Sequence, residues 1–143
     1  MSLYQFFASE KEMPEFDNMN PTVINVNGEH CVISCHSNFE KFVPMRILKE
    51  DDLSYAYSFT DKRFVNFFEG ECSDTNAKVI IDYIKIVLKD RFCISLFNTW
   101  MEDKSELVTR KICINDLTIE EIKGIWGQRL FKQNECLIVF RSY

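Results

Sequence analysis

The residues best suited to chemistry gather in one short segment, residues 30–36, which reads HCVISCH. It holds both histidines of the chain and two of its six cysteines, namely His30, Cys31, Cys35 and His36. Imidazole nitrogens and thiolates are ligands that zinc prefers, and a cysteine served by a histidine can act as a nucleophile. The segment is therefore a candidate metal or thiol site.

The spacing within this segment argues against both kinds of site if the segment is a strand. A strand rises ~3.3 Å per residue, which places Cys31 and Cys35 ~13 Å apart and the two histidines ~20 Å apart. Zinc–ligand bonds measure ~2.0–2.3 Å and a disulfide needs Cα atoms within ~7 Å, so neither pair can share an ion or form a bridge. Adjacent strand residues also point to opposite faces, which separates Cys35 from His36. A site at these two residues stays open if residues 34–36 curl.

Other patterns that support catalysis or cofactor binding are missing from the sequence. It contains no glycine-rich dinucleotide loop, no phosphate loop and no G-x-S-x-G nucleophile motif. Its acidic residues cluster at 50–52, 69–74 and 102–106, in predicted connections, where charged side chains are ordinarily solvated. We therefore predict no catalytic residue, no cofactor and no metal ligand.

Charge and cysteine usage limit the partners and the compartment of the chain. Seventeen basic and 22 acidic residues leave a net charge of −5. A phosphate backbone calls for a basic patch and none stands out, so nucleic acid is not expected as a partner. No apolar run approaches the ~20 residues that span a bilayer, and no signal peptide is expected. The cysteines mostly sit in apolar runs, which is typical of reduced thiols and favours a cytoplasmic protein.

The elements that would position a site begin with a β-rich N-terminal half. Residues 3–9 are aromatic and predict a first strand. Within residues 22–35, Asn27 and Gly28 separate two strand-like runs. This pattern is typical of a hairpin, because a type I′ turn needs positive φ at both central residues. The aromatic runs at residues 55–60 and 64–68, with Asp61 and Lys62 between them, predict the two strands of a second hairpin.

The second half, residues 64–141, shows regular periodicity. Ser73 can cap a helix whose apolar residues recur at spacings of three and four. Thr118 and Glu121 form the capping box of a second, shorter helix. Strand-like runs precede, separate and follow these helices. The resulting order, β-α-β-β-α-β, is that of the ferredoxin-like unit.

These elements predict an α+β fold in a single domain. Its ferredoxin-like unit spans about residues 64–141, and the β-rich extension with the Asn-Gly hairpin, residues 1–60, packs against it. A sheet with the same elements in a different strand order stays open as an alternative.

One face of the predicted sheet points to a function. Both helices of a ferredoxin-like unit cover the same face, so the other face must be covered by something else. That face is too apolar to lie wholly in water and too polar for a deep core. It could be covered by the N-terminal segment, whose hairpin could extend or fold over the sheet, by a second protomer or by a ligand. Its candidate interaction residues are Ser95, Phe97, Thr99, Thr109 and Lys111.

Three short segments resemble a family of small, uncharacterised bacterial proteins. They are YQFFAS at residues 4–9, INDLTI at residues 114–119 and ECLI at residues 135–138. The resemblance implies a bacterial protein, implies no particular activity and supplies no site residue.

The sequence thus favours a non-catalytic cytosolic domain that binds another protein or a second copy of itself. The alternative is a small enzyme or small-ligand-binding protein that uses acidic or thiol side chains. Such an enzyme would need a concave pocket holding a titratable group with a perturbed pKa.

Overall fold

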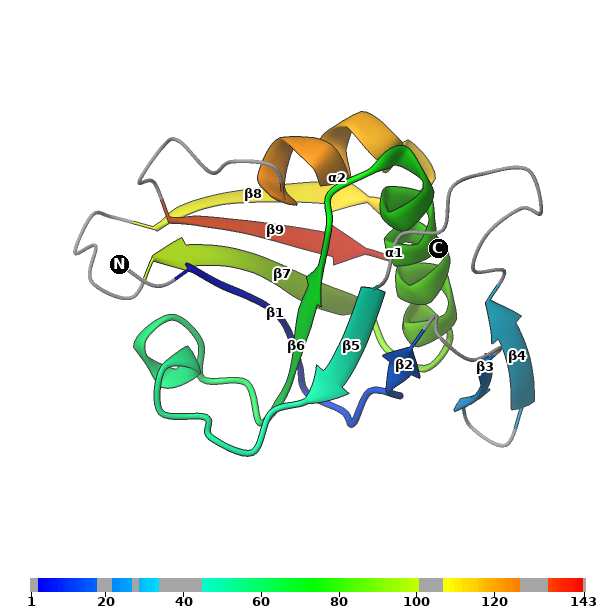
Figure 1. Cartoon of the computed structure of the whole chain (residues 1–143), viewed down its shortest axis with the longest axis horizontal. Coiled ribbons are helices and arrows are strands. Elements are labelled where there is room, and N and C mark those ends of the chain that lie inside the picture. Colours follow the sequence, from blue (N-terminus) through cyan, green and yellow to red (C-terminus); the bar gives the residue numbers. More distant parts are fainter. Residues whose placement is uncertain are drawn as a thin grey trace.

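A computed structural model describes residues 3–17, 22–26, 29–33, 45–100, 107–126 and 134–142 of the chain. Nine strands and two α-helices lie in these ranges, with three short 3-10 helices between them (Figure 1). In chain order they are β1 (Leu3–Ser9), β2 (Phe16–Asp17), β3 (Thr22–Val26), β4 (Glu29–Ile33), β5 (Met45–Lys49), η1 (Ala56–Ser58), β6 (Phe64–Gly70), α1 (Asp74–Val87), η2 (Leu88–Asp90), β7 (Cys93–Trp100), β8 (Val108–Cys113), η3 (Ile114–Asp116), α2 (Ile119–Trp126) and β9 (Glu135–Phe140).

Seven of the strands form one mixed sheet in the order β2-β5-β6-β1-β7-β9-β8. Neighbouring strands are antiparallel except β8 and β9, which run parallel because α2 connects them as a crossover helix. The first strand, β1, lies in the middle and pairs with β6 on one side and β7 on the other. The structure therefore confirms that the fold combines a sheet with α-helices.

The predicted ferredoxin-like unit is wrong, although its elements occur in the predicted order. Within residues 64–141 the structure has β6, α1, β7, β8, α2 and β9 in succession. However, β1 occupies the position between β6 and β7, and β9 lies between β7 and β8. The sheet is also larger than that unit, because the N-terminal half contributes β1, β2 and β5 to it.

Both helices pack on one face of the sheet, where they build the main core. The apolar stripe of α1 is buried there with residues of α2 and with inward side chains such as Phe7, Leu96 and Leu137. The predicted caps are present. The Ser73 hydroxyl accepts a hydrogen bond from the Asn76 amide at 3.1 Å, and the Thr118 hydroxyl accepts one from the Glu121 amide at 3.3 Å.

The predicted Asn-Gly hairpin has the expected strands. β3 and β4 pair antiparallel as a separate two-stranded sheet, with Val26 opposite Glu29. This confirms the pairing, while the Asn-Gly turn itself lies outside the described residues.

Two buried polar side chains fasten the loop after β1 to the rest of the molecule. The Arg91 guanidinium donates to the Ser9 hydroxyl at 2.9 Å, to the carbonyls of Lys11 and Glu12 at 2.8 and 2.9 Å, and to the Asp90 carboxylate at 2.8 Å.

The second of these side chains, Tyr83, lies on α1. Its hydroxyl donates to the Pro14 carbonyl at 2.6 Å and is completely buried. Burial raises its pKa above the ordinary value of 10.0.

Candidate functional site

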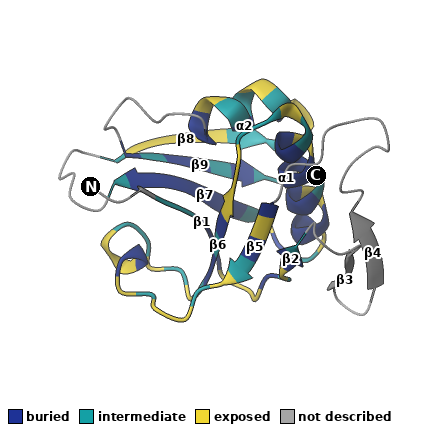
Figure 2. Cartoon of the chain, viewed as in Figure 1, coloured by how far each residue is buried: buried dark blue, intermediate teal, exposed yellow. Residues whose placement is uncertain are grey.

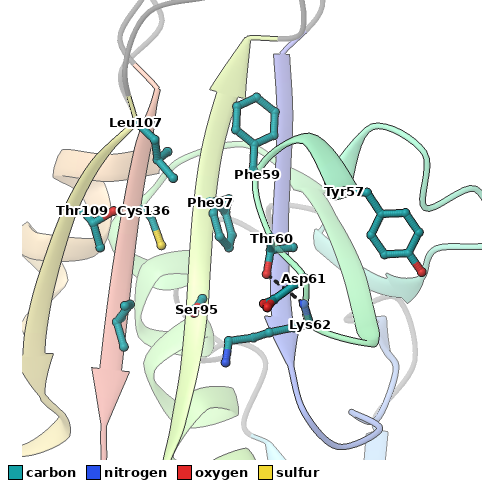
Figure 3. A pocket seen from close by; sticks show the side chains of 11 residues that line it. Tyr57, Phe59, Thr60, Asp61, Lys62, Ser95, Phe97, Leu107, Thr109 and Cys136 are labelled. Atoms are coloured by element: carbon teal, nitrogen blue, oxygen red, sulfur yellow. Dashed lines mark hydrogen bonds between the residues drawn. The ribbon is translucent and has the colours of Figure 1, made fainter.

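The face of the sheet opposite the helices carries a groove of 830 Å³ (Figure 3). Strand register determines its floor, because residues paired across neighbouring strands point to the same face. One row runs from Thr109 on β8 through Cys136 on β9 to Phe97 on β7. Phe97, Cys136 and Ile138 give the floor its apolar character, and Ser95 and Thr109 add hydroxyls.

The segment between β5 and β6 forms one wall of the groove. Its shape comes from short-range side-chain hydrogen bonds. The Asp52 carboxylate accepts from the Ser54 amide at 3.0 Å, and the Glu50 carboxylate accepts from the Tyr55 hydroxyl at 2.9 Å. These bonds turn the chain so that η1 lies over the sheet, and the predicted strand at residues 55–60 is therefore wrong.

Aromatic contacts anchor this wall to the central strands. The ring of Tyr55 stacks on Tyr4 with centroids 4.4 Å apart and meets the edge of Phe6 at 5.5 Å. Phe6 in turn stacks on Phe97 at 4.7 Å. Ala56, the first residue of η1, is fully buried. The wall thus rests on a second, smaller core on this face of the sheet.

The wall carries an exposed aromatic ring in η1 and two charged side chains beyond it, and in Figure 3 the ring, that of Tyr57, points to the outer side of the wall, away from Phe97. Tyr57 is 59% exposed. Asp61 and Lys62 follow, and Figure 3 shows the Lys62 side chain extending from the wall toward β7, the strand that carries Ser95. The Lys62 side chain is 21% exposed, and its amino group lies 3.3 Å from a carboxylate oxygen of Glu10.

The thiol of Cys136 lies in the groove floor and is held protonated. Burial raises its pKa to about 12, and the hydrogen bond with Ser95 and the charge of Lys62 offset this only in part. A thiolate, and not a thiol, is the nucleophile in cysteine chemistry. Cys136 therefore behaves as a buried apolar group at neutral pH.

Only some of the predicted face residues line the groove. Ser95, Phe97 and Thr109 all line the groove. Thr99 is fully buried, and its hydroxyl donates to the Tyr4 carbonyl at 3.2 Å. Lys111 pairs in register with Ile138, which places it on the groove face of β8, and it is exposed.

Sequence reasoning missed the wall that covers this face. The sequence predicts cover from the N-terminal segment with its Asn-Gly hairpin, whereas the residues that form this wall belong to the segment between β5 and β6. Its signal was a run of aromatic residues between two polar stretches, a pattern that was interpreted as a strand. The missed groove residues are Tyr57, Phe59, Thr60, Asp61, Lys62, Leu107, Cys136 and Ile138.

The histidine and cysteine segment is described only in part. His30 and Cys31 are neighbours in β4, opposite Asn25 and Ile24 of β3. Cys35 and His36 lie outside the described residues, so the prediction for this segment stays a prediction. Within the described parts of the chain, no three histidine, cysteine, aspartate or glutamate side chains come together in a way that could hold a metal ion.

Comparison of the chain with protein-family models, with curated proteins and with solved structures finds no match. The resemblance to small bacterial proteins is not tested by this result and stays a prediction. Among the helices of the described residues, none has the length and apolar character needed to cross a membrane.

Proposed function

We propose that this chain is a non-catalytic, cytosolic protein-interaction domain whose binding surface is the groove. The observation that carries the proposal is the form of the groove, an apolar sheet floor between the η1 wall and β8 with an exposed tyrosine at its rim. Protein interfaces are enriched in such aromatic anchors, and they bury an apolar centre within a polar rim.

The titratable groups of the groove favour binding over catalysis. The groove holds one thiol, and the raised pKa of Cys136 opposes its use as a nucleophile. The Lys62 amino group is engaged by Glu10, outside the groove lining. Among the described cysteines, Cys93, Cys113 and Cys136 are free thiols, which supports a reducing compartment.

Affinity capture with matched variants tests this proposal. The bait is the full chain, used to capture partners from a lysate of the cells that make it, and each candidate is then repurified and titrated by calorimetry. Tyr57→Ala removes the exposed ring at the groove, and Thr109→Arg fills the groove beside β8. Lys78→Glu is the control, because Lys78 lies on α1 with its side chain 55% exposed and, of the described carboxylates, pairs only with Asp82.

We expect a partner that binds the unchanged chain and the Lys78→Glu variant equally, and that binds both groove variants at least about tenfold more weakly, a difference of ~1.4 kcal/mol. Equal binding by all four proteins would show that the groove is not the binding surface. Groove binding of a small molecule alone would instead support the small-ligand alternative.

A further inference from the structure

The outermost strand beside the groove has an unpaired edge among the described residues. β8 ends the seven-stranded sheet and pairs only with β9. Val108 is 39% exposed, and Thr109, Arg110 and Lys111 are exposed as well (Figure 2). A strand whose edge is open presents its backbone groups as a template for another strand.

The direction of the β8 backbone groups follows from one hydrogen bond. The Val108 amide donates to the Asn134 carbonyl at 2.9 Å, so the backbone groups of Val108 point toward β9. Backbone direction alternates along a strand. The amide and carbonyl groups of Thr109, Lys111 and Cys113 therefore point away from β9, and no described residue pairs with them.

The same alternation sends the side chains of Thr109 and Lys111 to the groove face. Each lies opposite a groove residue of β9, Cys136 and Ile138 respectively. An added strand would lie ~4.8 Å outside β8. Every second side chain of that strand would then lie on the groove face, beside Thr109 and Lys111.

Charge decides what kind of strand fits this edge. Lys111 forms no ion pair with a described carboxylate, whereas Arg110 on the other face of β8 is held by Glu121 at 3.0 Å. The acidic residue of the groove lining, Asp61, belongs to the opposite wall. A second copy pairing through β8 would place its basic residues against those of the first, and like charges across a strand pair are destabilising.

We propose that β8 accepts an extended segment of a partner protein as an eighth strand, with acidic side chains on the groove face beside Lys111. This inference rests on the proposed function and specifies the kind of partner. The main-chain hydrogen bonds would supply affinity, and the groove-face side chains would supply specificity.

The test uses a fluorescent peptide as long as β8 that alternates valine and glutamate, titrated with the full chain at low ionic strength and followed by fluorescence anisotropy. A matched peptide alternates valine and lysine. Lys111→Glu reverses the charge at the edge. Lys111→Pro removes the central outward amide, a change that edge strands tolerate because no ladder bond is lost.

We expect the glutamate peptide to bind and the lysine peptide to bind at least about tenfold more weakly. Both Lys111 variants should weaken binding of the glutamate peptide to a similar extent, and Lys78→Glu should leave it unchanged. Amide exchange measured on β9 in the Lys111→Pro protein would confirm that β8 and β9 remain paired.

Three results would overturn the inference: no binding of the glutamate peptide, equal binding of both peptides, or full binding by the Lys111→Pro protein. A doubled mass in light scattering that Lys111→Pro reduces to one chain would assign the edge to a second copy instead. The proposed function is judged separately. A natural partner lost by Tyr57→Ala but retained by Lys111→Pro would preserve the groove proposal and reject strand addition.

Discussion

At the scale of single residues, Arg91 joins segments that are far apart in the sequence. It lies just before β7, and its guanidinium holds the end of β1 and the loop that follows. The planar guanidinium offers several donors in fixed directions, which a lysine ammonium cannot reproduce. Arg91 and the side chain of Asp90 are both nearly buried, so the partners of this cation have little access to water.

We predict that Arg91→Ala lowers the free energy of unfolding by about 3 kcal/mol, because it leaves a buried carboxylate and several acceptors unsatisfied. Arg91→Lys should recover only part of this loss. Arg110→Ala is the control, since it breaks an exposed ion pair, and it should cost no more than about 1 kcal/mol. Urea unfolding followed by circular dichroism measures all three variants, and equal losses for Arg91→Ala and Arg110→Ala would refute the role assigned to Arg91.

A second residue-scale prediction concerns the pH dependence of stability. The pKa of Tyr83 is raised by burial, so the folded chain retains a proton that the unfolded chain releases above pH 10.0. Its contribution to stability is therefore complete below pH 10.0 and declines as the pH rises further.

We predict that Tyr83→Phe costs about 1 kcal/mol at pH 8, through loss of the hydrogen bond to Pro14. By about pH 11 the unchanged protein should have lost ~1.4 kcal/mol of stability that the variant keeps, so it should no longer be the more stable of the two. Urea midpoints at the two pH values measure this difference, with Tyr57→Phe as an exposed control. A gap that stays constant with pH would contradict the assignment.

At the scale of elements, β1 makes the two halves of the chain interdependent. It pairs with β6 through residues such as Phe7 opposite Asn66, and with β7 through pairs such as Phe6 opposite Phe97. Phe6 and Phe7 are fully buried on opposite faces of the sheet, so β1 contributes to both cores.

We therefore predict that a fragment of residues 60–143 does not fold, because removal of β1 leaves β6 and β7 without a shared neighbour. Its amide NMR spectrum should lack the dispersion of the full chain. In the full chain, Ala8→Pro should disrupt the sheet, because proline in a central strand removes ladder hydrogen bonds, whereas Lys111→Pro at the edge should fold. A dispersed spectrum from the fragment would show that β1 is dispensable.

At the scale of the whole molecule, local sequence patterns predict the helices and strands but not which strands lie side by side in the sheet. The cap at Ser73 depends on residues close in sequence, and alternation placed Ser95, Phe97 and Thr109 on one face. Strand order depends instead on contacts between distant segments, such as Leu3 with Trp100, which no local period encodes.

The groove wall was missed for a related reason. Its aromatic run has the composition of a strand, but the hydrogen bonds that the Asp52 and Glu50 carboxylates accept turn the backbone before a strand can form. Short polar side chains that bond to nearby amides compete with regular secondary structure in this way.

The central position of β1 also bears on how the chain folds during synthesis. β1 leaves the ribosome before its partner β7, which ends at Trp100. Until then the aromatic residues of β1 have no complete sheet to join, and pairing over such sequence distances is slow. The nascent chain therefore passes through a period in which Phe6 and Phe7 are exposed to chaperones or to aggregation, and the sheet closes only after β7, β8 and β9 have been made.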